Sequence, residues 1–393
     1  MKAGLPGAAA LGDPRMSEVQ IRNSRYYNGV GKLRTTIYCA ALLLPSLFEP
    51  SGRADSGLTN AAQASSLFES QWKLTLPGSP SAPAAYDSTH AYIPLRDGKL
   101  IAVALKDGRT SWTVDAPTTL APAAGGMSVF VAGDKDIRAL NAASSEETWR
   151  VVLDDPANLA PVFDTGWLFV STANGHLVAM RAADGEVVWT LDAGAPFRAP
   201  PAPAGNSVYL PLSDGRIVAV DIHTGQVLWT RTLPGPPSDI LALDDRLFVG
   251  SHDNYFYCIA LKDGGIKWKW RTGSDIVAAP VVDESRVYFI SLDNVLRALD
   301  RGSGSQRWQR AMASRTVGGP MRSGSVIVVA TLSPQLQAYQ RIDGKPAGSS
   351  PTPEGDEQSS TLAAPPQVVS LEGQDAFVLL TSQGVIQFFS MTS

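Results

Sequence analysis

Short apolar runs, rich in β-branched and aromatic residues, recur from about residue 82 to the end of the chain. Pairs such as Asp97-Gly98, Asn174-Gly175 and Asp184-Gly185 separate these runs. Because Asp-Gly and Asn-Gly readily adopt the positive φ angles of tight hairpins, each group of runs predicts four antiparallel strands. No helical periodicity of credible length competes with this pattern. The chain is therefore predicted to be all-β.

Tryptophan marks the period of this pattern. Seven of the nine tryptophans follow one another at intervals of 40, 37, 40, 40, 39 and 40 residues. They are Trp72, Trp112, Trp149, Trp189, Trp229, Trp268 and Trp308. A fixed period of this length indicates a repeat architecture.

Two further positions keep the same spacing. Ten residues before each of the last six tryptophans lies a small residue: Ala102, Ala139, Ala179, Ala219, Cys258 and Ala298. Four residues before the same six tryptophans, five repeats have glycine and the remaining repeat has Ser145. The glycines are Gly108, Gly185, Gly225, Gly264 and Gly304. We expect each tryptophan on an outer strand, where its ring covers the seam to the next unit and the small residue makes room for it. The expected role of all these residues is structural.

Four-stranded units of about 40 residues, repeated many times, predict a β-propeller. Units begin near residues 82, 120, 159, 198, 238, 277, 317 and 362, which makes eight. The last unit has only three strands, and 71–76 is a lone strand before the first unit. We expect that lone strand to be the outer strand of the last blade, which closes the ring and hides two sheet edges. The predicted domain is an eight-bladed propeller of four-stranded antiparallel blades over 71–393.

The seventh unit departs from the repeat. Gly348 stands where tryptophan is expected, and 345–361 is rich in Pro, Ser and Gly. Such a segment cannot bury much apolar surface, so we expect a mobile loop. This loop is either functional or a tolerated surface insertion.

Residues 1–70 are expected to be an N-terminal extension with a secretion signal at about 30–54 or 30–64. Basic residues precede an apolar run over 37–48, and small residues follow it. These are the parts of a signal peptide, and the run is too short for a transmembrane span. The alternative is a disordered tail. Because signals begin close to the start of a chain, we expect the true initiation site near Met16 or Val30. Cys39 follows bulky Tyr38 and is not expected to carry a lipid.

The charge balance excludes some classes of function. The formal net charge is −4 and 18% of residues are charged, against roughly 25% in typical soluble domains. A nucleic-acid binder usually has a basic face, so no nucleic-acid partner is expected. Two cysteines and four scattered histidines provide neither a disulfide framework nor a zinc or metalloprotease motif.

The repeat resembles a known family. The segment 219–229 fits the pyrroloquinoline-quinone (PQQ) repeat, A-x-D-x-x-T-G-x-x-x-W, at every fixed position. The segment 298–308 fits it with Ser303 in place of threonine. The resemblance covers about 320 residues. It implies an eight-bladed propeller in which tryptophans dock between blades, and it implies less about activity.

Two branches of that family are relevant. Quinoprotein dehydrogenases bind PQQ over a calcium ion at the propeller axis, and the soluble alcohol dehydrogenases among them use an aspartate base and adjacent cysteines. This chain has no adjacent cysteines. Its acidic and amide candidates recur at the blade period in turns, as turn chemistry predicts: Asp134, Asn174, Asp214, Asp253 and Asp293. The other branch is the BamB-like propellers of outer-membrane β-barrel assembly, which this chain resembles in length and blade simplicity and which bind no quinone.

We therefore expect a non-enzymatic, exported propeller that is a protein–protein interaction scaffold in the cell envelope, periplasmic or associated with the outer membrane. The expected partner is a protein, such as a β-barrel assembly component, and the protein is expected to be a monomer without a cofactor. Arg198 and Arg315 lie near the starts of inner strands and are the proposed contacts to an acidic partner, facing the central channel. The alternatives are a dehydrogenase that uses PQQ and calcium, and a propeller that senses a ligand or carbohydrate.

Overall fold

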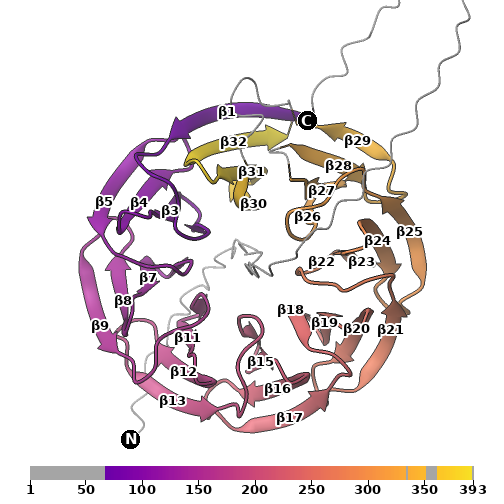
Figure 1. Ribbon diagram of the computed structural model, residues 1–393, viewed down its shortest axis with the longest axis horizontal. Coiled ribbons are helices and arrows are strands. Elements are labelled where there is room, and N and C mark those ends of the chain that lie inside the picture. The colour runs from indigo at the N-terminus through magenta and orange to yellow at the C-terminus, as the bar shows by residue number, and fades with distance from the viewer. Residues whose placement is uncertain (1–66, 333–334, 351–360, 392–393) are drawn as a thin grey trace, which may run out of the picture.

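The computed structural model describes residues 67–332, 335–350 and 361–391. Within these ranges the chain forms strands and turns, and no helix that could span a membrane is present. The strands form eight antiparallel sheets of four strands each. The sheets stand as blades around a ring, with the first strand of each blade nearest the centre (Figure 1). The predicted all-β, eight-bladed fold is confirmed.

The first four blades run as follows. Blade 1 has β2 (Ala85–Tyr86), β3 (His90–Pro94), β4 (Lys99–Ala104) and β5 (Thr110–Asp115). Blade 2 has β6 (Ala123–Gly125), β7 (Ser128–Ala132), β8 (Asp136–Asn141) and β9 (Glu147–Val152). Blade 3 has β10 (Val162–Asp164), β11 (Trp167–Ser171), β12 (His176–Arg181) and β13 (Val187–Asp192). Blade 4 has β14 (Ala202–Ala204), β15 (Ser207–Pro211), β16 (Arg216–Asp221) and β17 (Val227–Thr232).

The other four blades complete the ring. Blade 5 has β18 (Pro237–Leu243), β19 (Arg246–Ser251), β20 (Tyr255–Ala260) and β21 (Ile266–Arg271). Blade 6 has β22 (Val281–Val282), β23 (Arg286–Ser291), β24 (Val295–Asp300) and β25 (Gln306–Ala311). Blade 7 has β26 (Met321–Ser323), β27 (Val326–Ala330), β28 (Leu336–Gln340) and β29 (Pro346–Ser349). Blade 8 has β30 (Leu362–Leu371), β31 (Gln374–Thr381), β32 (Val385–Met391) and, as its outer strand, β1 (Phe68–Thr75).

Closure of the ring joins the two ends of the propeller. β1 pairs antiparallel with β32, from Phe68 opposite Met391 to Thr75 opposite Val385 (Figure 1). The predicted closing strand is thus confirmed as the outer strand of blade 8. It begins at Phe68 rather than at residue 71. The expected secretion signal lies outside the described residues.

Each repeated tryptophan lies on an outer strand, and six of the seven lie directly opposite the small residue of the neighbouring strand, whereas Trp72 lies opposite Phe388. The pairs are Ala102–Trp112, Ala139–Trp149, Ala179–Trp189, Ala219–Trp229, Cys258–Trp268 and Ala298–Trp308. These six residues are fully buried, and because their side chains are small, little volume lies directly opposite each of the six rings. The ring therefore has room to lean toward the next blade.

The repeated glycine receives that ring. A Cβ at Gly264 would lie 2.7 Å from the Trp229 ring of the preceding blade, and its φ is +67°. Gly108, Gly185, Gly225, Gly304 and Gly344 face Trp72, Trp149, Trp189, Trp268 and Trp308 in the same way. In the blade with Ser145, that serine adopts a φ of 64°.

A hydrogen bond fixes each ring at the seam. The indole Nε1 of all seven repeated tryptophans donates to a backbone carbonyl of the next blade, at 2.7–3.1 Å. A buried indole N–H without an acceptor would be costly, so this bond and the apolar contact favour the same docked position. Each seam thus combines burial, shape and one oriented hydrogen bond.

The seam between blades 7 and 8 is built differently. A Cβ at Gly348 would lie 3.0 Å from Cβ of Leu67. Phe68 is buried in one apolar cluster with Met321 and Val328 of blade 7. The N-terminal strand thus supplies the apolar bulk that a tryptophan supplies elsewhere. Of the predicted loop at 345–361, Pro346–Ser349 form β29, and 351–360 lie outside the described residues.

The antiparallel order gives the ring two faces. The crossover face carries the loops from the outer strand of one blade to the inner strand of the next, together with the turns between second and third strands. Backbone bridges join these two kinds of segment, as between Phe197 and Leu212 and between Thr316 and Thr331. The hairpin face carries the remaining turns, including the glycine turns on which the tryptophans dock.

We predict that the cost of G264A depends on Trp229. Both the positive φ and the ring oppose a Cβ at residue 264, so this variant should lose about 2–4 kcal/mol of unfolding free energy. G205A is the control, because Gly205 has a φ of +56° and no atom within 4 Å of a new Cβ. It should lose about 1 kcal/mol.

The double variant W229A/G264A separates the cost of backbone strain at residue 264 from the cost of the clash between the new Cβ and the Trp229 ring. With the ring removed, the added cost of G264A should fall to that of G205A, measured by urea unfolding in a double-mutant cycle. Equal costs of G264A with and without Trp229 would show that the ring does not dock on this glycine.

Candidate functional site

The inner strands surround a central cavity of about 570 Å³. Its walls repeat the pattern of alanine followed by proline, as at Ala82-Pro83, Ala121-Pro122 and Ala160-Pro161. Proline donates no backbone hydrogen bond and therefore suits a strand edge that faces open space. The inner edges are thus apolar and unable to pair with an added strand at these positions.

Among the described residues, none that lines the cavity has a charged side chain. Its polar residues are Ser81, Thr119, Asn158 and Gln367. Calcium prefers carboxylate ligands, and an anionic quinone needs cationic partners to leave water. Neither kind of group lines this cavity, so its residues do not fit a PQQ–calcium pair. The described residues also contain no cluster of three or more His, Cys, Asp or Glu that could hold a metal ion.

The periodic polar residues of the turns lie on the crossover face and outside the lining. Most are held by a nearby partner. The Asn174 amide donates to Asp155, Asp214 pairs with Arg216, and Tyr257 donates to Asp253. Their periodicity thus reflects turn chemistry and local pairing rather than a shared ligand set.

Arg198 takes part in a chain of contacts that joins three loops of the crossover face. Its guanidinium lies 2.9 Å from Nε2 of His252, and Nδ1 of His252 lies 3.0 Å from Asp275. A guanidinium can only donate, so Nε2 accepts and Nδ1 carries the proton that is donated to Asp275. This contact links the loop before blade 4 with blade 5.

Arg315 lies in the loop between β25 and β26 and is exposed. Neither Arg315 nor Arg198 contributes to the lining of the central cavity. The two arginines lie in the crossover loops that precede blades 4 and 7. Their expected orientation toward the central channel stays a prediction.

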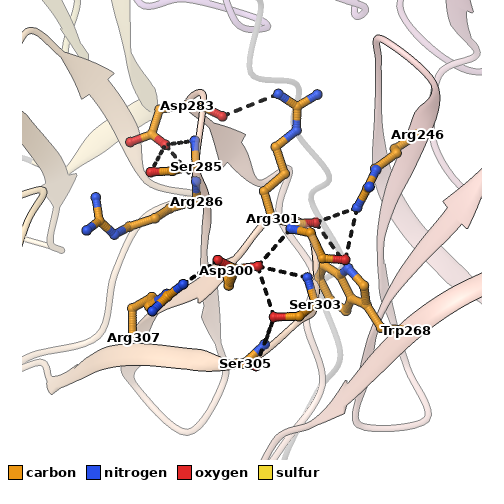
Figure 2. Close-up of polar contacts among 11 residues, drawn as sticks. Arg246, Trp268, Asp283, Ser285, Arg286, Asp300, Arg301, Ser303, Ser305 and Arg307 are labelled. Carbon is orange, nitrogen blue, oxygen red and sulfur yellow. Dashed lines mark hydrogen bonds and ion pairs between the residues drawn. The ribbon is translucent and has the colours of Figure 1, made fainter.

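The hairpin face of blades 5 to 7 carries an ionic network that sequence analysis missed. Figure 2 shows Arg301 at its centre, with Arg246 donating to the backbone oxygens of Arg301 and Gly302, at 2.6 and 3.2 Å. Arg301 pairs with Asp244 of blade 5 and approaches the carbonyl of Asp283 of blade 6 at 3.5 Å. The network ties neighbouring blades together beside the docked Trp268.

A break in the repeat could have revealed this network. The carbonyl that accepts each tryptophan N–H belongs to an apolar residue in five blades: Leu105, Ala142, Ala182, Ile222 and Leu261. In blades 6 and 7 it belongs to Arg301 and Arg341. Arginine at this position in two successive blades, where the other five blades have an apolar residue, indicates ionic contacts that the repeat itself does not require.

Asp283 holds the second arginine. Its side chain is 2% exposed and lies 3.3 Å from the Arg341 guanidinium. Burial alone raises the pKa of this carboxyl, but backbone N–H donors, the Tyr288 hydroxyl and Arg341 outweigh it and lower the pKa overall. Burial and the neighbouring Asp283 carboxylate raise the pKa of Tyr288. The carboxylate is therefore a charged anchor between blades 6 and 7.

Comparison with known protein families gives matches along the propeller. A family model described as "Outer membrane protein assembly factor BamB" matches residues 69–162, 96–239 and 238–393. The outer membrane protein assembly factor BamB of Xanthomonas campestris pv. campestris is 31% identical over 109 residues. That alignment covers 25% of this chain and spans about a quarter of the relative, 26% of its length.

Solved structures share the fold at low sequence identity. BamB from Moraxella catarrhalis superposes with a TM-score of 0.64 and 16% identity, covering 82% of this chain and all of that one. Quinohemoprotein alcohol dehydrogenase from Comamonas testosteroni has a TM-score of 0.63 and 13% identity, covering 83% of this chain and 76% of that one. At these identities the likeness establishes architecture and leaves activity open.

Low pH should weaken the ion pair between Asp293 and Arg297 on the crossover face. Burial raises the pKa of Asp293, but hydrogen bonds from Arg297 and Ser291 outweigh it and lower the pKa to about 2. Because a free aspartate titrates near 3.9, the pair stabilises the fold above that pH and loses its effect as pH falls toward 2. We predict that D293N costs about 2 kcal/mol of unfolding free energy at pH 6.

That difference should shrink as the pH approaches 2, in urea unfolding followed by tryptophan fluorescence. D154N is the control, because Asp154 is exposed. A cost of D293N that stays constant from pH 6 to pH 2 would contradict the assignment.

Proposed function

The chain belongs to the family of outer membrane protein assembly factor BamB, and from this premise we propose that it is an exported, non-enzymatic scaffold in the cell envelope. Its partner is a component of the machinery that assembles β-barrel proteins in the outer membrane. It acts as a monomer, in the periplasm or at the outer membrane, and uses no cofactor. The family match carries this proposal, because it extends over 69–393 and so covers nearly all the described residues.

The way in which the ring is built supports a binding role. Seven docked indoles and the β1–β32 pairing hold all eight blades in one closed ring. A rigid surface loses little conformational entropy when it binds a partner. Arg315 is exposed on the crossover face, and Arg198 is held there by His252. We propose both as contacts to an acidic surface of the partner.

The quinoprotein dehydrogenase remains the alternative function, because quinohemoprotein alcohol dehydrogenases share the architecture. The composition of the cavity walls favours the scaffold. Small apolar residues and prolines line the position that a quinone would occupy at the propeller axis, and the described part of the chain contributes no charged side chain to that lining. A ligand-sensing propeller would need polar groups that converge in one place, and the four polar lining residues come from different blades.

Calorimetry separates the scaffold from the dehydrogenase. When PQQ is titrated into the purified protein with calcium, we expect no saturable heat, because no lining residue offers charge to either group. A quinoprotein dehydrogenase stripped of its cofactor and titrated under the same conditions provides the positive control. Binding of one PQQ per chain at micromolar or tighter affinity would overturn the scaffold proposal.

Crosslinking in intact envelopes tests the partner. We expect the tagged wild-type protein to crosslink to a β-barrel assembly component. We predict that R198E/R315E lowers the yield at least tenfold, because both substitutions place negative charge against an acidic surface. R109E is the matched control, since Arg109 is an exposed arginine on the hairpin face of blade 1.

Two outcomes would contradict these assignments. Absence of any crosslink between the wild-type protein and an assembly component would overturn the proposed function. An unchanged yield with R198E/R315E would leave the scaffold in place and exclude the two arginines as its contacts.

A further inference from the structure

Blades 3, 4 and 5 carry exposed apolar side chains on their outer strands. These are Val187 and Val188 on β13, Val227 and Leu228 on β17, and Ile266 on β21, each 44–53% exposed. Figure 1 shows the three strands following one another along the outer rim. We call these five residues the apolar belt. All of them lie one or two positions before a docked tryptophan, at the end of the strand nearest the hairpin face.

The fold does not require apolar residues at these positions. The corresponding residues are Thr110 and Ser111 in blade 1, Glu147 and Thr148 in blade 2, and Gln306 and Arg307 in blade 6. Those blades have the same strand pairing and the same docked tryptophan. Exposed apolar side chains in three successive blades are therefore a property of this surface and not of the repeat.

The docked indoles join the belt across the seams. The Trp189 ring lies against Gly225, two residues before Val227, and the Trp229 ring lies against Gly264, two residues before Ile266. Both rings are partly exposed. Three successive blades thus carry exposed apolar side chains on their outer strands, with a partly exposed indole at each seam between them. Contiguous exposed apolar surface marks an interaction site more reliably than scattered residues do.

The backbone at the belt is unsuited to strand addition. In each of the three outer strands a bulge interrupts the pairing beside the tryptophan. Ala179 pairs with Trp189 and Met180 with Val187, so that Val188 is the extra residue. The same shift leaves Leu228 extra in β17 and Lys267 extra in β21. A bulge breaks the regular ladder that an added strand would extend. A partner would therefore contact the side chains of the belt rather than its backbone. Because these side chains lie on three strands, they favour a helix that lies across the strands.

Charge gives the belt a direction. Its blade 5 end is basic, with Lys262, Lys267, Lys269 and Arg271 exposed around a single acid, Asp263. At the blade 3 end, Asp184 and Glu186 share Arg181. A bound segment therefore gains most by placing acidic residues over blade 5.

We propose that the apolar belt is the docking surface for an amphipathic helix of a partner protein. The apolar stripe of that helix covers Val187, Val188, Val227, Leu228 and Ile266, and acidic residues at one end lie over Lys267 and Lys269. Recognition of this kind reads residues at helical spacing on one face of the partner. The proposal rests on the proposed scaffold function and adds the chemistry of the partner.

A peptide titration tests the belt without the native partner. The probe is a fluorescent amphipathic helix of about 18 residues with a leucine stripe and glutamates at one end. We expect saturable binding to the purified protein by anisotropy, and at least tenfold weaker binding to V187T/V188S/V227T/L228S. The substituted residues are of the types that blade 1 carries, so the fold accommodates them. M127T/I342T is the control, because Met127 and Ile342 are exposed apolar residues outside the belt.

Charge supplies a second readout. A matched peptide with lysines in place of the glutamates should bind the wild-type protein more weakly. K267E/K269E should reverse that preference. Equal affinities of the belt variant and the control variant, or no saturable binding to the wild-type protein, would overturn the proposal. So would a concentration-dependent dimer in light scattering that the belt variant abolishes, because the belt would then bind a second copy of this chain.

The two proposals fail separately. If the peptide does not bind but the protein still crosslinks to an assembly component, the belt is not the docking surface and the scaffold function stands. Peptide binding at the belt without that crosslink would retain the docking surface and overturn the proposed partner machinery.

Discussion

The docking of one indole on one glycine turn is the constraint on which this propeller depends. A blade twists and has no core of its own, so its stability comes from the seam with its neighbour. At most seams the ring has a small residue beside it, a turn without Cβ beneath it and a carbonyl for its N–H, as Ala219, Gly264 and Leu261 provide for Trp229. These requirements account for the positions that recur in most repeats. They leave the rest of each blade free to vary.

That freedom places function at the positions where the repeat varies. The residues that recur at a fixed spacing are used at the seams between blades, and the cavity walls repeat alanine and proline in most blades. Differences between blades occur instead on the rims and the outer strands. Arg301 and Arg341 replace apolar residues on the hairpin face of blades 6 and 7, and valine and leucine replace polar residues on the outer strands of blades 3 and 4. In a structure with near-symmetry, asymmetry of this kind is the most informative signal about partners.

Sequence periodicity predicted the eight blades and the closing strand, because a pattern repeated in register fixes both pairing and count. It could not predict contacts between residues of different blades. Arg198, for example, donates a hydrogen bond to His252, which is 54 residues away in the chain. The bulk that replaces the missing tryptophan at Gly348 comes from Leu67, at the other end of the chain. Such contacts depend on loop conformation, which carries no period. The arginines of blades 6 and 7 were visible in the sequence, but only when compared with the acceptor position of the other five blades.

BamB from Moraxella catarrhalis and quinohemoprotein alcohol dehydrogenases share this architecture. Seam chemistry determines the ring and specifies nothing about its axis, so the same blades can surround a cofactor or an apolar cavity. Here proline at the inner edges removes backbone donors, and the lining residues that the structure describes offer no charge to offset the desolvation cost of an anionic cofactor. Polar chemistry is concentrated at the rims, where water lowers the cost of charge and a partner can reach it. A propeller built in this way is suited to binding at its periphery.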